Sequence, residues 1–252
     1  MTAAPHLPAA YRLLSYSRLA STNDEAKRLA RDGAEEGVIV WAREQSAGRG
    51  RRGRQWIGIP GNLFLSIILR PDRPPAAASQ LGFVAALALG DAIAASAPPR
   101  AELRCKWPND VLLNGRKFAG ILLESETRLS ATLDWVVLGV GVNVVAHPDG
   151  TDYPTTSLRE EGCLDLDAAG MLAAFARCFL AWYETWRDEG FAPVRAAWLP
   201  RATGLGDEIT VRLDRENVAG RFLGIEADGA LALETVAGAR RIAAGDVFPA
   251  NR

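Results

Sequence analysis

The chain has 252 residues, a formal net charge of -1 and 48% hydrophobic residues, a composition that is ordinary for a globular protein of one or two domains. Proteins that coat a nucleic-acid backbone usually carry a basic excess, so this balance favours a small anionic ligand over a long polyanion. Three cysteines without a C-x-x-C pair and two histidines argue against a disulfide framework, a structural zinc site or a His-rich metal site, and they indicate a reducing compartment.

Neither the N-terminal segment nor the most apolar stretch of the sequence suggests a secreted or membrane protein. The N-terminal segment MTAAPHLPAAYRLL lacks the basic start and apolar core of a signal peptide. The most apolar stretch, LGFVAALALGDAIAASA, is interrupted by Asp91 and falls short of the ~20 apolar residues that a membrane span needs. We therefore expect a cytoplasmic protein with no membrane partner.

The first half of the chain predicts alternating helices and strands. STNDEAKRLARDG reads as a helix, because Thr22 and Glu25 have capping-box spacing and Gly33 can end it. GVIVWA and NLFLSIIL read as buried strands, on either side of a glycine- and arginine-rich loop. A long helix of small residues is expected at 76–97, where Pro98 and Pro99 close it.

A hairpin follows. Asn114-Gly115 between VLL and KFAGILL is the strongest short hairpin signal, so KWPND at 106–110 precedes one strand and Lys117 follows the turn. DWVVLGVGVNV reads as a further strand, with Gly139 and Gly141 at points where a side chain would crowd something.

The last third of the chain changes character. Helices are expected at 166–188 and just before Leu199. From about Gly206, the segments EITVRL, VAGRFLGIEA, ALALETV and ARRIAAGDVF read as short strands of a small all-β unit. We predict two domains, a catalytic or binding domain over 1–203 and a β-domain over 204–252.

The loop GRGRRGRQW, at 48–56, is the most unusual segment. Its glycines let backbone N–H groups approach an anion, and its four arginines add permanently charged, forked donors. Trp56 either stacks on a base or covers the loop. The loop alone leaves open a solvated charged loop, a nucleic-acid patch or a disordered arginine-glycine segment, although the flanking strands argue against disorder.

Three other polar clusters have structural explanations beside the functional ones. KWPND can be a strand-entry turn capped by Asp110, or a rigid corner that aims polar side chains. Lys117 can be a solvated strand lysine, although Gly120 clears space beside it. Ser21-Thr22-Asn23 can cap a helix or bind an amide-like ligand head, and the segment does not decide between these.

Taken together, these segments resemble the biotin–protein ligases, also called biotin–[acetyl-CoA-carboxylase] ligases. The resemblance is carried, in the family's order, by STN at 21–23, EQSAGRGRRGRQW at 44–56, KWPND, KFAGIL at 117–122 and GVGVN at 139–143. TTSL at 155–158 resembles the family's Ala-Thr-Ser-Leu, with Thr155 in the first place. The resemblance implies an α+β fold, a mixed sheet with packed helices as in class II synthetases, followed by an SH3-like β-barrel.

The activity implied by the resemblance has two steps. ATP and biotin form biotinyl-5′-AMP, and biotin then passes to a specific lysine of a biotin carboxyl carrier domain of a biotin-dependent carboxylase. Mg²⁺ is expected with the ATP phosphates rather than in a cage made of protein ligands alone. The arginine loop is expected to order over the intermediate and to keep water from it.

The resemblance also assigns the site residues. The expected catalytic groups are Lys117, Arg49, Arg51 and, with the least support, Asp110. The expected biotin contacts are Ser21, Thr22, Asn23 and Gln45 for the ureido head, and Arg49, Gly50, Arg51, Lys117 and Gly120 toward the carboxylate. The expected nucleotide contacts are Arg52, Arg54, Trp56, Asn109 and Asn143.

Three other functions stay open. The nearest is a lipoate or octanoate ligase or transferase of related fold, and the others are a nucleic-acid-binding module and a catalytically silent biotin sensor. Family members that repress transcription carry an N-terminal winged helix-turn-helix, and the ~20 residues before Ser21 show no such pattern, so we expect no DNA-binding role. A homodimer through an exposed strand edge also stays open.

Overall fold

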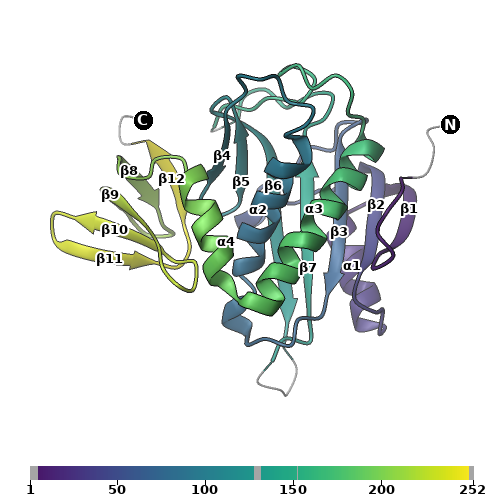
Figure 1. Ribbon diagram of the computed structural model, residues 1–252, viewed down its shortest axis with the longest axis horizontal. Helices are drawn as coiled ribbons and strands as arrows, with labels where there is room; N and C mark the ends of the chain where they lie inside the picture. The colour runs from purple at the N-terminus through teal and green to yellow at the C-terminus, as the bar shows by residue number, and fades with distance from the viewer. Residues whose placement is uncertain (1–4, 128–131, 152, 250–252) are drawn as a thin grey trace.

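The structure is a computed structural model that describes residues 5–127, 132–151 and 153–249. It consists of two β-sheets, with helices packed against the larger one (Figure 1). The outer ends of the two predicted domains, 1–4 and 250–252, lie outside the described residues.

The larger sheet has seven strands in the order β1-β2-β3-β7-β6-β5-β4. β1 runs parallel to β2 and the other neighbouring pairs are antiparallel, so the sheet is mixed, as predicted. Its central strands are runs of aliphatic residues because both of their faces are covered. The strands are β1 (Arg12–Leu19), β2 (Val38–Gln45), β3 (Leu63–Leu69), β4 (Leu103–Lys106), β5 (Asp110–Leu113), β6 (Arg116–Glu126) and β7 (Trp135–Val142).

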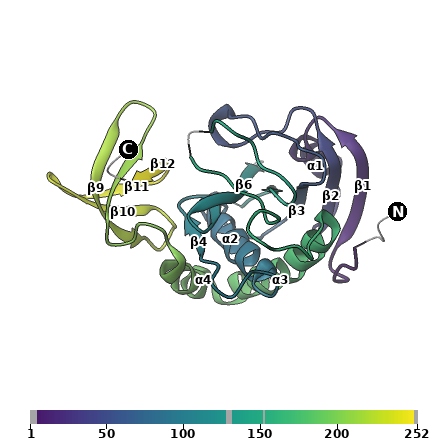
Figure 2. The same cartoon turned by 90° about the horizontal axis from the view of Figure 1, so that it is seen from above.

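The helices cover both faces of this sheet, unequally. α1 (Thr22–Arg31) lies against β2, β3 and β7 on one face. α2 (Gln80–Ile93), α3 (Ala168–Glu189) and α4 (Phe191–Trp198) form a layer on the other face (Figures 1 and 2). Pro75–Ile93 is apolar and long enough to cross a membrane by composition, but 67% of it is buried in this structure, where α2 packs against both the sheet and α3.

The smaller sheet is antiparallel, with five strands in the order β11-β10-β9-β8-β12. Its strands are β8 (Glu208–Arg212), β9 (Asn217–Ile225), β10 (Leu231–Thr235), β11 (Gly238–Ile242) and β12 (Asp246–Pro249). It packs beside α4 (Figure 1), and Trp107 Nε1 donates a hydrogen bond to the carbonyl of Gly229 at 3.0 Å. Its apolar side chains belong to the same core as those of the larger sheet.

Most predicted elements are present, with four corrections. The helix expected at 76–97 is shorter, because the prolines before it allow only a 3₁₀ turn at Pro75–Ala77 and the chain turns again after Ile93. Ser21, not Thr22, caps α1, since its hydroxyl oxygen accepts the Asp24 N–H at 3.4 Å. The segment ARRIAAGDVF forms two strands rather than one, and β1 and β4 were not anticipated.

The predicted hairpin between β5 and β6 is confirmed. Asn114 and Gly115 both have positive φ, +50° and +75°, as a type I′ turn requires. A bulge at Val111/Leu112 shifts the register, so that Asp110 lies opposite Gly120 and Leu112 lies opposite Lys117. The turn therefore brings the end of KWPND beside Lys117.

Candidate active site

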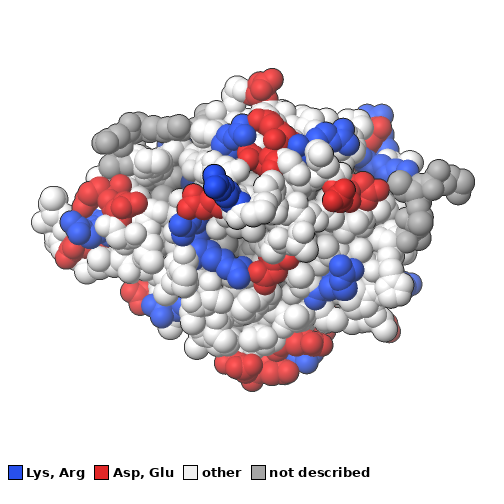
Figure 3. Space-filling model, turned by 45° about the horizontal axis from the view of Figure 1, so that its top comes forward, with Lys and Arg blue, Asp and Glu red and all other residues white. Residues whose placement is uncertain are grey.

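A cavity of about 370 Å³ opens where the start of α1, the arginine loop, strands β6 and β7, residues 148–151 and 153–155, and β12 meet. All the predicted site residues line it except Arg52. On the face of the molecule shown in Figure 3, cationic and acidic side chains are interspersed and do not form a patch of one sign.

The start of α1 and the end of β2 form one end of the cavity, which we call the head end. Ser21, Thr22 and Asn23 are buried there, at 3–4% exposure. Gln45 Oε1 accepts the backbone N–H of Thr22 at 2.7 Å, so a side chain that lines the cavity holds the two elements together. Asn23 turns its amide inward, donating to Glu124 at 2.8 Å and accepting from Ser66 at 2.6 Å.

Glycines on β6 and β7 form the floor beneath Trp56. A Cβ atom at Gly141 would lie 2.4 Å from Trp56 Cε2, and one at Gly120 would lie 2.8 Å from Trp56 Cζ3. A Cβ at Gly139 would lie 2.1 Å from Asn23 Oδ1. The expectation that side chains at Gly139 and Gly141 would crowd something is confirmed, and Trp56 covers Gly141 and Gly120.

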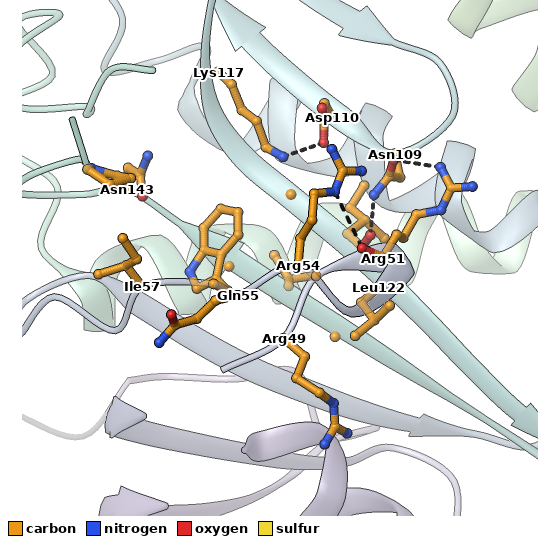
Figure 4. A pocket seen from close by; sticks show the side chains of 18 of the residues that line it. Arg49, Arg51, Arg54, Gln55, Ile57, Asn109, Asp110, Lys117, Leu122 and Asn143 are labelled. Atoms are coloured by element: carbon orange, nitrogen blue, oxygen red, sulfur yellow. Dashed lines mark hydrogen bonds and ion pairs between the residues drawn. The ribbon is translucent and has the colours of Figure 1, made fainter. Parts of the chain in front are cut away.

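The arginine loop is itself a small hairpin. Gly50 N–H donates to the carbonyl of Arg54 at 2.7 Å, and Trp56 N–H donates to the carbonyl of Gly48 at 2.9 Å. Arg52 and Gly53 adopt positive φ at its tip. The glycines therefore let the loop fold back on itself, and the arginine side chains leave it in different directions (Figure 4).

The four arginines divide between the cavity and its borders. Arg49 points away from Asp110 and Lys117 (Figure 4) and pairs with both carboxylate oxygens of Asp24, at 2.7 and 2.5 Å. Arg51 donates to Asn109 Oδ1 at 3.1 Å, and burial lowers its pKa.

The other two arginines reach the smaller sheet. Arg54 pairs with Asp246 of β12 at 2.9 Å. Arg52 lies outside the cavity because it pairs with Asp214 and Asp246. Ion pairs between Arg52, Arg54 and these two carboxylates thus tie the loop to the smaller sheet.

Asp110 lies between two lysines in the cavity wall. Lys117 Nζ is 2.6 Å from one of its carboxylate oxygens and Lys106 Nζ is 3.8 Å from the other. Burial raises the pKa of Asp110, but the two ammonium groups outweigh it and hold the pKa below its ordinary value. Burial also lowers the pKa of Lys106, which Asp110 partly offsets. The cavity therefore offers an ionised carboxylate flanked by cations.

Comparison with known proteins shows the family to which the chain belongs. Residues 56–200 match the model of the Biotin/lipoate A/B protein ligase family, and residues 204–248 match the Biotin protein ligase C terminal domain. The chain is 44% identical over 237 residues to the biotin–[acetyl-CoA-carboxylase] ligase of Paracoccus denitrificans, covering 92% of this chain and 98% of that protein.

The chain belongs to the biotin/lipoate A/B protein ligase family.

Other members of the ligase family agree in sequence and in fold. The bifunctional ligase/repressor BirA of Bacillus subtilis is 36% identical over 242 residues, covering 93% of this chain and 73% of that protein. The biotin protein ligase of Aquifex aeolicus in complex with biotin and ATP superimposes with a TM-score of 0.79, at 25% identity over 94% of this chain and 97% of that one. The α+β fold with a C-terminal β-domain is therefore that of biotin protein ligases.

The ligase cavity also contains residues that the sequence did not single out. Lys106 is buried, with Nζ 3.8 Å from the Tyr153 ring centre and 5.2 Å from the Phe248 ring centre. Phe248 comes from β12, so the smaller sheet contributes a side chain to the cavity. Lys106 was inside a quoted motif, whereas no sequence signal linked Tyr153 or Phe248 to it.

Asn109 and Asn143, two of the predicted nucleotide contacts, form hydrogen bonds within the protein. Asn109 Nδ2 donates to the carbonyl of Ile121 at 2.7 Å while its Oδ1 receives Arg51. Asn143 is buried, and its Nδ2 donates to the carbonyl of Thr156 at 3.0 Å. Both side chains line the cavity in fixed orientations, and their role toward a nucleotide stays a prediction.

Proposed function

We propose that the chain is an ATP-dependent biotin–protein ligase that works in two steps. In the first, a biotin carboxylate oxygen attacks the α-phosphorus of ATP, forming biotinyl-5′-AMP and releasing pyrophosphate. In the second, the amine of a lysine on a biotin carboxyl carrier domain attacks the acyl carbon, and AMP leaves as the amine loses a proton. One observation carries the proposal, namely the 44% identity over nearly the whole of both chains to a biotin–[acetyl-CoA-carboxylase] ligase.

The charges in the cavity suit the first step. A carboxylate and a triphosphate repel each other, and Lys117, Arg51 and Arg54 supply fixed positive charge beside the space where they would meet. Arg49 reaches the same cavity from the Asp24 side and is available to exchange that partner for an anionic substrate. We propose that Mg²⁺ would accompany ATP rather than sit in a cage of protein ligands, and that as a hard cation it would offset phosphate charge beside Lys117 and Arg51.

The position of Asp110 suits the second step. It remains ionised between Lys106 and Lys117, so it can attract the ammonium group of an incoming lysine and orient the amine that forms from it. Its hydrogen-bond-distance contact with Lys117 also keeps that ammonium pointed at the cavity. We propose orientation as the role of Asp110 rather than a permanent structural pairing.

The surroundings of the reaction are also part of the proposal. A carrier protein and ATP are both available in the cytoplasm, where we place the ligase. The interspersed charges in Figure 3 support the expectation that nucleic acid is not a partner. The exposed edge formed by β1 leaves room for a homodimer.

An assay of biotin transfer tests the proposed partner, a biotin carboxyl carrier domain, most directly. The protein is incubated with ATP, Mg²⁺, biotin and an isolated carrier domain, and the carrier mass is read by mass spectrometry. We expect one biotinyl group on one lysine, and none on a carrier whose acceptor lysine is replaced by arginine. An unmodified carrier, with adenylate formed normally, would contradict the proposed acceptor class.

A further inference from the structure

A chain of hydrogen-bonded side chains runs beneath the head end of the cavity, from the surface to the ligand-facing residues. Lys27 Nζ donates to Glu124 at 2.6 Å, and Asn23 Nδ2 donates to the other Glu124 oxygen at 2.8 Å. Ser66, which is fully buried on β3, connects Asn23 to the Thr22 hydroxyl. We call the following residues the polar chain: Lys27, Glu124, Asn23, Ser66, Thr22 and Gln45.

Glu124 determines how the first links of the polar chain are oriented. Burial raises the pKa of Glu124, but the hydrogen bonds from Lys27 and Asn23 outweigh it and hold the pKa below its ordinary value. Glu124 is therefore a carboxylate at neutral pH and can only accept hydrogen bonds. Asn23 must present its NH₂ group to Glu124, which leaves its carbonyl oxygen facing Ser66.

Counting protons extends this orientation to Thr22. The Ser66 hydroxyl has one proton and two oxygen neighbours, Asn23 Oδ1 at 2.6 Å and Thr22 Oγ1 at 2.8 Å. An amide oxygen can only accept, so the proton of Ser66 lies in the shorter contact, toward Asn23. The proton between Thr22 and Ser66 then has to come from Thr22.

Gln45 Oε1 is the weaker of two acceptors within reach of the Thr22 proton, because it lies 3.1 Å from the Thr22 hydroxyl oxygen, against 2.8 Å for Ser66 Oγ. It already receives the backbone N–H of Thr22 at 2.7 Å. A backbone N–H can only donate, so Gln45 must present its oxygen to Thr22 and keep its NH₂ group as a donor. Thr22 Oγ1, with its proton directed to Ser66, is left as an acceptor at the cavity wall.

The head end therefore has a defined donor and acceptor pattern. Thr22 Oγ1 accepts a hydrogen bond and Gln45 Nε2 donates one. Ser21 can also donate, because its hydroxyl only accepts in its contact with the Asp24 N–H and so keeps its own proton available. A cyclic urea, with one carbonyl and two N–H groups, complements this pattern, whereas a dithiolane ring offers no N–H group. Gly139 leaves the room that the Asn23 amide needs, since a Cβ there would lie 2.1 Å from Asn23 Oδ1.

We propose that Glu124 and Ser66 are positioning residues, which make Thr22 Oγ1 an obligatory acceptor for a ureido N–H of the substrate. The inference rests on the proposed function, because it takes biotin as the substrate. Neither residue needs to touch the ligand, since the negative charge of Glu124 is transmitted through the direction of successive hydrogen bonds.

The test compares biotin with a cyclic carbamate analogue in which oxygen replaces the ureido N–H that faces Thr22. For the intact chain, titration calorimetry is expected to show at least about tenfold weaker binding of the carbamate, because two acceptors then face each other. In Glu124→Gln the neutral amide can donate, the polar chain can reverse, and Thr22 can donate to the carbamate. The penalty for the carbamate is therefore expected to shrink to about threefold or less.

Glu126→Gln is the matched control, because Glu126 lies two residues further along β6 and pairs with Arg31 outside the polar chain. It is expected to keep the full penalty. If Glu124→Gln does not fold, Ser66→Ala replaces it, since it removes the acceptor that directs the Thr22 proton. An equal carbamate penalty in the intact chain and in the folded variant would overturn the inference alone. Failure of the intact chain to bind biotin would overturn the proposed function as well.

Discussion

Gly141 shows how one missing side chain shapes the cavity. A Cβ added at Gly141 would lie 2.4 Å from the Trp56 indole, which is closer than real Cβ contacts, so either the strand backbone or the ring would have to move. Gly141→Ala is expected to displace Trp56, at a cost of about 1–3 kcal/mol in the free energy of unfolding, and to weaken biotin binding at least about tenfold. Chemical denaturation and biotin titration measure the two effects.

Gly82 on α2 provides the control for that substitution. A Cβ there meets its nearest neighbour at 3.5 Å, an ordinary contact. Gly82→Ala is expected to leave biotin binding unchanged. If Gly141→Ala bound biotin as tightly as the unaltered chain does, the position of Trp56 over Gly120 and Gly141 would not matter for biotin binding.

Lys117 is the cation that we expect to matter most for adenylation. Lys117→Ala is expected to lower the rate of adenylate formation by about 10²–10³, the scale for removing one preorganised donor that stabilises developing charge. Rapid-quench measurement of biotinyl-5′-AMP gives the rate, and circular dichroism checks that the variant is folded. Near-normal synthesis of the adenylate would remove Lys117 from the catalytic groups.

At the scale of elements, the arginine loop and β12 behave as one unit. Asp246, whose side chain is largely buried, accepts ion pairs from Arg52 and Arg54, whose side chains are partly exposed to solvent that screens the pairs. Asp246→Ala is expected to raise the KM for ATP several-fold and to speed tryptic cleavage at the loop arginines. Overall stability is expected to change by less than about 2 kcal/mol, because both arginines are partly exposed and can be hydrated once Asp246 is removed.

Glu216 offers a comparison in the turn between β8 and β9, where it pairs with Arg240 and not with an arginine of the loop. Glu216→Ala is expected to leave both the KM for ATP and the cleavage rate as they are. Equal cleavage of the loop in the two variants would show that β12 does not restrain it.

Elements with strong local signals were predictable. The Asn114-Gly115 turn needs positive φ at both residues, and few dipeptides other than this one suit it, so the β5–β6 hairpin was identified from sequence. β1 was missed because its exposed and half-buried residues do not alternate clearly. The short β4 was missed because four residues carry too little periodicity for a strand to be recognised.

The candidate site was predictable where its residues belong to contiguous motifs. The quoted segments supply every predicted lining residue of the cavity, and Arg52 alone among the predicted site residues lies outside it. Phe248, Glu124 and Ser66 were not predicted, because their importance depends on contacts between strands that are distant in sequence. A serine within an aliphatic strand was the one available signal, because such a strand is expected to be buried and buried hydroxyls need partners.

At the scale of the whole molecule, Asp110 links stability to pH. Its pKa is lower in the folded chain than the ~3.9 of an unfolded aspartate, so its contribution is fully present above about pH 5 and is lost as the pH falls through the folded value. Thermal unfolding of the intact chain and of Asp110→Asn between pH 7 and pH 3 measures this. The gap in Tm is expected to narrow toward pH 3, and a gap that stayed constant would contradict the ionised state of Asp110.

Biotin-dependent exchange of labelled pyrophosphate into ATP, with lipoate and octanoate run in parallel, tests the central claim most directly. The reaction requires the whole molecule, because the cavity draws residues from the larger sheet, the arginine loop and β12. We predict exchange with biotin and none with the other two acids, which would establish adenylation and the identity of the acid together. Exchange with lipoate or octanoate instead of biotin would contradict the account. So would a folded protein that shows no exchange with any of the three acids.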